Sequence, residues 1–213
     1  MKPKSIPRSF GIVVATCLCL IAMPQANAAI TILDEGLNNT GNSSTIGSAS
    51  GSSGKAINFV MPAGQNYTLS QIILGLGDVQ NNETPLVQIW SDDGSSAPIG
   101  TLLHTLTNPS TLTNGQNTFT SSGFTLTANT PFWVVVRSTS GNFDWLGKSN
   151  DWSTTGIASH TARLFGTNSS GAGNWNSTST VLNQIQISAV PEPNTALAGL
   201  LLTVGMLSRR RRA

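Results

Sequence analysis

The feature that most constrains the fold is a period of two in the side chains of the central and late parts of the chain. Apolar residues occupy every second position in residues 124–128 and again in residues 185–189, with polar residues between them. Successive side chains of a strand point to opposite faces, so this pattern predicts half-buried antiparallel strands with one wet face. A helix would need apolar residues every three or four positions.

Three largely apolar runs, residues 72–76, 86–90 and 132–136, predict more central strands. Turn residues separate the predicted strands. These turn signals are Gly77-Asp78, Asp92-Asp93-Gly94, Asn114-Gly115, Asn129-Thr130-Pro131 and Ser140-Gly141-Asn142. Many short strands at this spacing predict an all-β fold, specifically an antiparallel, two-sheet, jelly-roll-like sandwich. Residues 38–55 are rich in Gly, Ser and Thr and contain one large apolar residue, Ile46, so they predict either a long surface loop or a strand with a weak signal.

The net charge of +2 comes from the two ends of the chain, which hold seven of the 11 basic residues. Residues 29–190 contain four basic and eight acidic side chains, so this part of the chain is acidic. Nucleic-acid binding is disfavoured, because phosphate neutralisation needs clustered Lys and Arg. The two cysteines, Cys17 and Cys19, lie near the N-terminus, which leaves the central domain without disulfides, thiolate nucleophiles or cysteine metal sites. We expect no metal and no cofactor.

The N-terminus has the three parts of a secretory signal peptide. A basic start is followed by an uncharged apolar run, residues 10–23, and by the small residues Ala26 and Ala28. We expect a signal helix over this segment and cleavage by signal peptidase after Ala28. A retained membrane anchor would need roughly 20 apolar residues, which is more than the run supplies. Lipidation is disfavoured because both cysteines lie inside the run.

The C-terminus also has three parts. Pro191, Glu192 and Pro193 are followed by an uncharged segment and then by the basic stop Arg209, Arg210, Arg211 and Arg212. As a helix, residues 195–207 would span only about 20 Å, which predicts a short transmembrane helix that is marginal as a permanent anchor. Four arginines favour the cytoplasmic side of the membrane and so place the β domain outside.

Residues 190–213 resemble the PEP-CTERM sorting signal, which carries the same motif, apolar helix and arginine cluster in this order. The resemblance implies processing by an exosortase, a membrane-embedded cysteine protease of Gram-negative bacteria. It predicts an exported protein of the cell surface or secreted fraction, anchored in the inner membrane only transiently. The chain then divides into a signal peptide (residues 1–28), an extracellular β-sandwich domain (residues 29–189) and a sorting signal (residues 190–213). The alternative is a simple tail anchor.

Residues 67–145 resemble the choice-of-anchor type R domain, an extracellular β module. The resemblance rests on four segments in the expected order, which are Tyr67-Thr68-Leu69-Ser70, Ile89-Trp90-Ser91-Asp92-Asp93-Gly94, Pro98-Ile99-Gly100-Thr101-Leu102-Leu103 and residues 126–133. Trp90 stands where that family usually has Tyr. The family has no established catalytic activity, so the resemblance implies an architecture and a location rather than a reaction.

Three tryptophans in segments rich in Gly, Asn and Ser are candidates for glycan contact, namely Trp145, Trp152 and Trp175. Flat rings beside amides and carboxylates suit a sugar face, but such rings more often serve a core or hold loops to it. Asp92 and Asp93 offer carboxylates to Ca²⁺, yet they lack the spacing of a calcium loop, and a local turn is the favoured alternative.

Two function classes follow. The first is a non-catalytic surface or matrix protein of biofilm, associated with exopolysaccharide, for which we expect no catalytic residues. The second is a secreted hydrolase acting on glycans, which would need Asp144, Asp151 or His160 in a deep cleft with paired acids. His104 and His160 are the only histidines, neither lies in a metal-binding pattern, and the chain has no G-x-S-x-G elbow.

Overall fold

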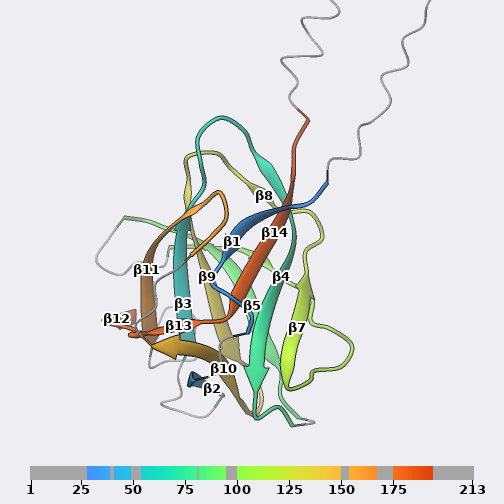
Figure 1. Ribbon diagram of the computed structural model, residues 1–213, viewed down its shortest axis with the longest axis vertical. Coiled ribbons are helices and arrows are strands. Elements are labelled where there is room, and N and C mark those ends of the chain that lie inside the picture. The colour runs from blue at the N-terminus through green and yellow to red at the C-terminus, as the bar shows by residue number, and fades with distance from the viewer. Residues whose placement is uncertain are drawn as a thin grey trace, which may run out of the picture.

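The structure is a computed structural model that describes residues 28–38, 41–48, 54–80, 82–94, 100–149, 154–166 and 175–193. The expected signal helix and the C-terminal transmembrane helix lie outside these residues. Within them the secondary structure is entirely β, and every strand pairing is antiparallel. The two sheets pack face to face, as expected for a sandwich (Figure 1).

Sheet A has eight strands and sheet B has six. The strands of sheet A are β1 (Ile30–Asp34), β2 (Asn42–Gly47), β4 (Tyr67–Gly77), β7 (Gly115–Thr120), β8 (Thr125–Leu126), β10 (Asn142–Ser149), β13 (Val181–Asn183) and β14 (Ile185–Pro191). The strands of sheet B are β3 (Gly54–Val60), β5 (Pro85–Ser91), β6 (Leu102–Thr105), β9 (Pro131–Ser138), β11 (Ser159–Gly166) and β12 (Trp175–Thr178). In sheet A the order is β1-β14-β4-β10-β13, with β7 and β8 on β4 and β2 on β10. In sheet B it is β12-β11-β3-β9-β5-β6.

The three apolar runs form strands as predicted, within β4, β5 and β9. Strand β9 shows why its run is continuous. Phe132, Val134 and Val136 face the main core between the sheets, whereas Trp133 and Val135 face a second, smaller apolar cluster. A strand that is buried on both faces carries apolar residues at successive positions rather than alternating ones.

All five predicted turns contain a residue with positive φ. These residues are Asp78, Gly94, Gly115, Asn129 and Gly141, with φ of 51°, 68°, 110°, 53° and 68°. Asp and Asn tolerate this left-handed region better than other residues with a Cβ, and glycine has no Cβ to clash. The turn prediction is therefore confirmed by the backbone itself.

Residues 38–55 contain a strand with a weak sequence signal, because β2 occupies positions 42–47. Ile46 is fully buried and lies opposite Phe143 of β10. Ser44 is also buried, whereas Thr45 between them is exposed. Burial therefore alternates along this part of β2, although hydropathy hardly does. By contrast, the predicted strand at 124–128 is only two residues long. Strand β4 begins at Tyr67, so Ala128 has no strand opposite it, and its amide donates to the Asn66 side chain instead (2.9 Å).

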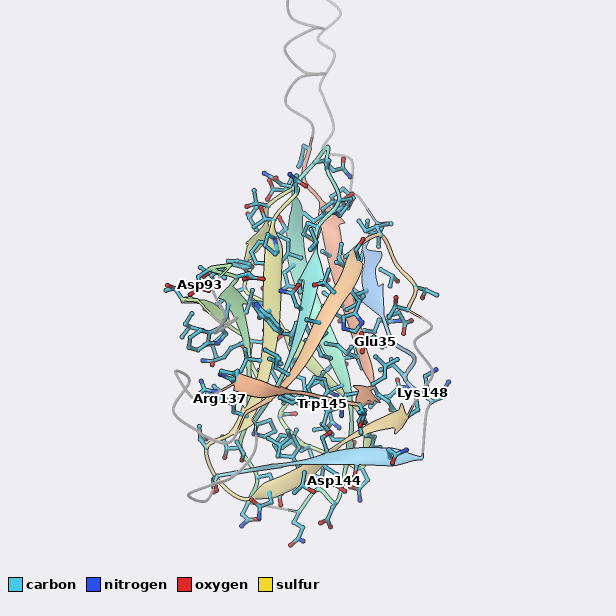
Figure 2. The ribbon with its side chains drawn as sticks, turned by 90° about the vertical axis from the view of Figure 1, so that its left-hand side faces the viewer. Glu35, Asp93, Arg137, Asp144, Trp145 and Lys148 are labelled. Carbon is cyan, nitrogen blue, oxygen red and sulfur yellow. The ribbon has the colours of Figure 1, made fainter. Side chains whose placement is uncertain are left out.

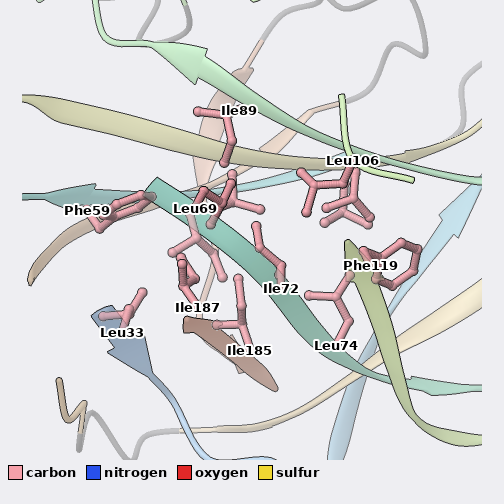
Figure 3. Close-up of a cluster of buried hydrophobic side chains, with 14 of the residues drawn as sticks. Leu33, Phe59, Leu69, Ile72, Leu74, Ile89, Leu106, Phe119, Ile185 and Ile187 are labelled. Carbon is pink, nitrogen blue, oxygen red and sulfur yellow. The ribbon is translucent and has the colours of Figure 1, made fainter. Parts of the chain in front are cut away.

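The main core lies between the two sheets (Figure 3). Sheet A contributes Ile72, Leu74 and Ile187, and sheet B contributes Phe59 and Ile89, all fully buried. Full burial of such a side chain stabilises the fold by roughly 1.5–3 kcal/mol.

Strand β4 changes its inward positions from odd to even numbers between Leu69 and Ile72. The register with β14 shifts at this point, as at a β-bulge, and the Ser70 hydroxyl donates to Ser188 O at 2.7 Å. The bulge lets both halves of β4 present their apolar residues to the core. It also sets the register at the far end of β14, where the Pro-Glu-Pro motif begins.

Candidate functional site

The Pro-Glu-Pro motif is docked on the folded domain at the end of sheet A. Strand β14 runs through Pro191, which pairs with Tyr67, so the expected domain boundary at residue 189 falls inside this strand. The Glu192 amide donates to Asn66 O at 3.0 Å. Pro193 is exposed and follows as the last described residue. Pro191 is therefore the last residue of the sheet, and Glu192 is bound to the domain just beyond it.

Two threonine hydroxyls hold the Glu192 carboxylate. Thr125 Oγ1 donates to Glu192 Oε1 at 2.8 Å, and Thr68 Oγ1 donates to the same oxygen at 3.3 Å. Thr68 and Thr125 lie directly opposite each other in the β4 and β8 pair. Residues in such a cross-strand pair on one face have Cβ atoms about 5 Å apart, so their side chains can reach one acceptor. We call Thr68 and Thr125 the threonine clamp.

The described beginning and end of the chain meet at one pole of the molecule. Strand β1 pairs with β14, and Ile30 lies opposite Ala189 (Figure 1). Ala28 is exposed just before β1. The other predicted processing residues, Ala26 and Arg209 to Arg212, lie outside the described residues.

Two of the three tryptophans predicted to contact glycans, Trp145 and Trp175, are buried. Trp145 of β10 is completely buried, and its Nε1 donates to Gln184 O at 2.8 Å (Figure 2). Trp175 of β12 is 5% exposed and packs in the second apolar cluster with Trp133. A sugar needs an open ring face, and these two rings have theirs covered by the protein. Trp152 lies outside the described residues.

Asp92 lies in a local turn, as the alternative to a calcium site predicted. Its Oδ1 accepts the Gly94 amide at 2.9 Å, and its Oδ2 accepts from Asn58 Nδ2 at 3.1 Å. Protein donors therefore engage both carboxylate oxygens. Among the residues described by the structure, no group of three or more His, Cys, Asp or Glu side chains is placed to hold a metal ion.

Asp144, one of the acids named for a hydrolase, is held by the neighbouring strand β2. Asp144 lies near the pole opposite the chain ends, where it accepts hydrogen bonds from Ser43 Oγ (3.0 Å) and Thr45 Oγ1 (2.8 Å) of β2 (Figure 2). Asp151 lies outside the described residues. Asp144 thus serves a cross-strand contact between β10 and β2.

His160 instead pairs with an acid that the sequence did not single out. Its Nδ1 lies 3.1 Å from Glu35 Oε1, and the two side chains are 6% and 0% exposed. Its Nε2 lies 3.2 Å from Ala162 O. Glu35 follows β1 of sheet A and His160 belongs to β11 of sheet B, so the pair joins the two sheets. It is buried rather than open to a cleft, which suits a structural role.

His104 lies at the edge of sheet B, where burial lowers the pKa of its imidazole below its usual value. Its Nε2 is 3.0 Å from Ser121 Oγ, and its ring stacks on Phe124 with centroids 5.4 Å apart. These contacts fit a neutral imidazole packed on an aromatic ring.

An open cleft of about 390 Å³ lies near the turn before β5. It is lined by Gln80, Glu83, Thr84, Asn108, Pro109, Ser110, Thr111 and Leu112. Its one lining carboxylate, Glu83, accepts the Gln80 amide through Oε2 at 2.7 Å. A glycosidase of the usual kind needs a pair of carboxylates, which this lining does not supply.

The fold and these sites define an all-β protein of two packed antiparallel sheets. No family model matches the chain, and neither a curated protein nor a solved structure matches it. Within the described residues, no helix is long and apolar enough to cross a membrane.

Proposed function

We propose that the chain is a surface or matrix protein exported by a Gram-negative bacterium and processed at both ends. Signal peptidase removes residues 1–28, and an exosortase recognises Pro191, Glu192 and Pro193 and removes the tail. The carrying observation is that the motif leaves the sandwich at the end of β14, beside the start of β1. A domain whose two ends share one pole can face the membrane with that pole while its body stays outside.

The tail after the motif supports the same topology. Its uncharged segment is short for a bilayer, and its four arginines favour the cytoplasmic side. In this proposal the helix is a temporary stop that keeps the motif at the outer boundary of the inner membrane. The exosortase then releases the domain to the surface.

We further propose that the β domain is non-catalytic, jelly-roll-like and akin to the choice-of-anchor type R module. Association with exopolysaccharide is its proposed role. The support is a weakly charged domain rich in Ser, Thr and Asn, whose hydroxyl and amide groups can donate hydrogen bonds to sugar hydroxyls and accept them. The buried tryptophans contribute to the core and not to this contact.

Mass spectrometry of the cell-surface fraction tests the proposal. In cells that contain an exosortase, we expect an N-terminus at Ala29 and a C-terminus at or shortly after Pro193. In matched cells without the exosortase, the tail should be retained up to Arg212. Deletion of Arg209 to Arg212 should weaken the membrane stop and let uncut protein escape. Surface protein that still carries Arg212 in the presence of the exosortase would refute sorting and leave a simple tail anchor.

A further inference from the structure

The structure places the recognition motif in contacts that a protease would have to replace. The Glu192 carboxylate lies in the threonine clamp, and its backbone amide donates to Asn66 O. A protease that reads an extended segment uses the backbone and the side chains of that segment. The same groups of Glu192 cannot serve the folded domain and the protease together.

We infer that the threonine clamp is a latch that withholds Glu192 from the exosortase until the end of β14 peels away from β4. This inference rests on the proposed sorting function and names its regulation. Only the open form binds the protease in this scheme, so the apparent affinity falls with the fraction of molecules that are open. The latch therefore slows the processing of a folded domain.

The end of β14 is built to open locally. Pro191 and Pro193 have no N–H, so Glu192 supplies the motif's only backbone donor. Val190 and Glu192 are half-buried, whereas Ile187 and Ala189 just before them are fully buried. A strand end with few backbone bonds and little apolar burial opens at a lower free energy than the whole domain. The clamp contributes two hydroxyl donors at this weak point.

The first test measures the latch without the protease. In full-length protein from cells without an exosortase, the Glu192 amide is the one exchangeable backbone amide between Pro191 and Pro193. Hydrogen exchange followed by mass spectrometry should show that the double variant Thr68→Val and Thr125→Val exchanges this amide faster, by about threefold to tenfold for each hydroxyl lost. Thr118→Val is the matched control, because Thr118 is a half-buried threonine of β7 that also lies opposite β4. Unchanged exchange in the double variant overturns the latch.

The second test measures processing in cells that contain the exosortase. A pulse-chase experiment should show faster loss of the tail in the double variant, and rates like the original protein's in Thr118→Val and Thr125→Ser. The serine variant keeps the hydroxyl and so tests the donor itself. A processing rate in the double variant that equals the original rate overturns the gating role, even if its exchange is faster. Absence of processing in every variant, including the original protein, refutes the proposed sorting function instead and is thereby distinguished from failure of the latch.

Discussion

The two ends of β14 are held in different ways. At its start, Ile185 is fully buried, its carbonyl accepts the Glu35 amide at 2.9 Å, and the preceding Gln184 carbonyl accepts from Trp145. At its end, Pro191 is half-buried, and Glu192 is held by one backbone bond and two threonine hydroxyls. Along the seven residues of β14, the side chains thus change from fully buried and apolar to half-buried, and polar contacts follow at Glu192.

Because of this difference, the start of β14 contributes to the stability of the whole domain, whereas its end can open locally. Burial between two sheets is lost only when the sheets separate, so the start of β14 is tied to global unfolding. Hydrogen bonds at a half-exposed strand end can break while the rest of the domain stays folded. One strand can therefore anchor the fold and still offer its last residues to another protein.

The largest effect is expected from Trp145, which supports the start of β14. Trp145→Ala removes a fully buried ring and the bond to Gln184 O, so we expect a loss of about 3–5 kcal/mol in the free energy of unfolding. Urea denaturation measures the loss. Leu103→Ala is the control, because Leu103 is 41% exposed and should cost less than about 0.5 kcal/mol. Equal effects of the two variants would contradict the anchoring role.

The next effect concerns the buried pair of Glu35 and His160. The backbone amide of Glu35 donates to Ile185 O, so this pair also supports the start of β14. Glu35→Gln leaves His160 facing an amide, and we expect a loss of about 3 kcal/mol in stability. The carboxylate of Asp144 is half-exposed, so Asp144→Asn should cost less than about 1 kcal/mol. Adding His160→Gln to Glu35→Gln should cost less than the sum of the single variants, because the two residues interact. Strict additivity would show that they do not.

The smallest effect is the pH dependence from His104. Burial lowers the pKa of His104 in the folded protein, so the unfolded chain binds this proton more readily. The resulting stabilisation is complete above the unfolded pKa of about 6.5 and is lost as the pH falls from there towards the lower folded pKa. Denaturation curves between pH 7.5 and pH 5 should show the original protein losing stability relative to His104→Gln. A constant difference between the two would contradict this sign.

Much of the fold could be predicted because its signals are local. Turn residues marked five positions that need positive φ, and apolar runs marked β4, β5 and β9. For the region of β2, the sequence predicted either a loop or a strand. Ser44 is buried there beside Ile46, and hydropathy alone does not reveal a buried serine. Its pairing with β10 joins residues about a hundred positions apart, and no local pattern encodes that pairing.

The site was harder to predict because its contacts are non-local. The sequence marked Glu192 as part of a motif, but the hydroxyls that hold it come from Thr68 and Thr125 on other strands. Glu35 was only one acid among eight in the sequence, and its partner His160 follows the segment 155–158, which hydrogen-bonds to β1 at Ile32 and Asp34. The polar residues next to the tryptophans in the sequence suggested exposed rings for glycan contact. Tertiary packing instead buries Trp145 and Trp175.

Hydrogen exchange along β14 tests the contrast between its two ends most directly. In the full-length protein at increasing urea, the Ile187 amide should exchange only through global unfolding, so its protection should fall with urea as stability does. The Glu192 amide should exchange faster and with little dependence on urea, because local opening exposes little surface. Equal protection and equal urea dependence of the two amides would contradict the account, since β14 would then be held uniformly from Ile185 to Glu192.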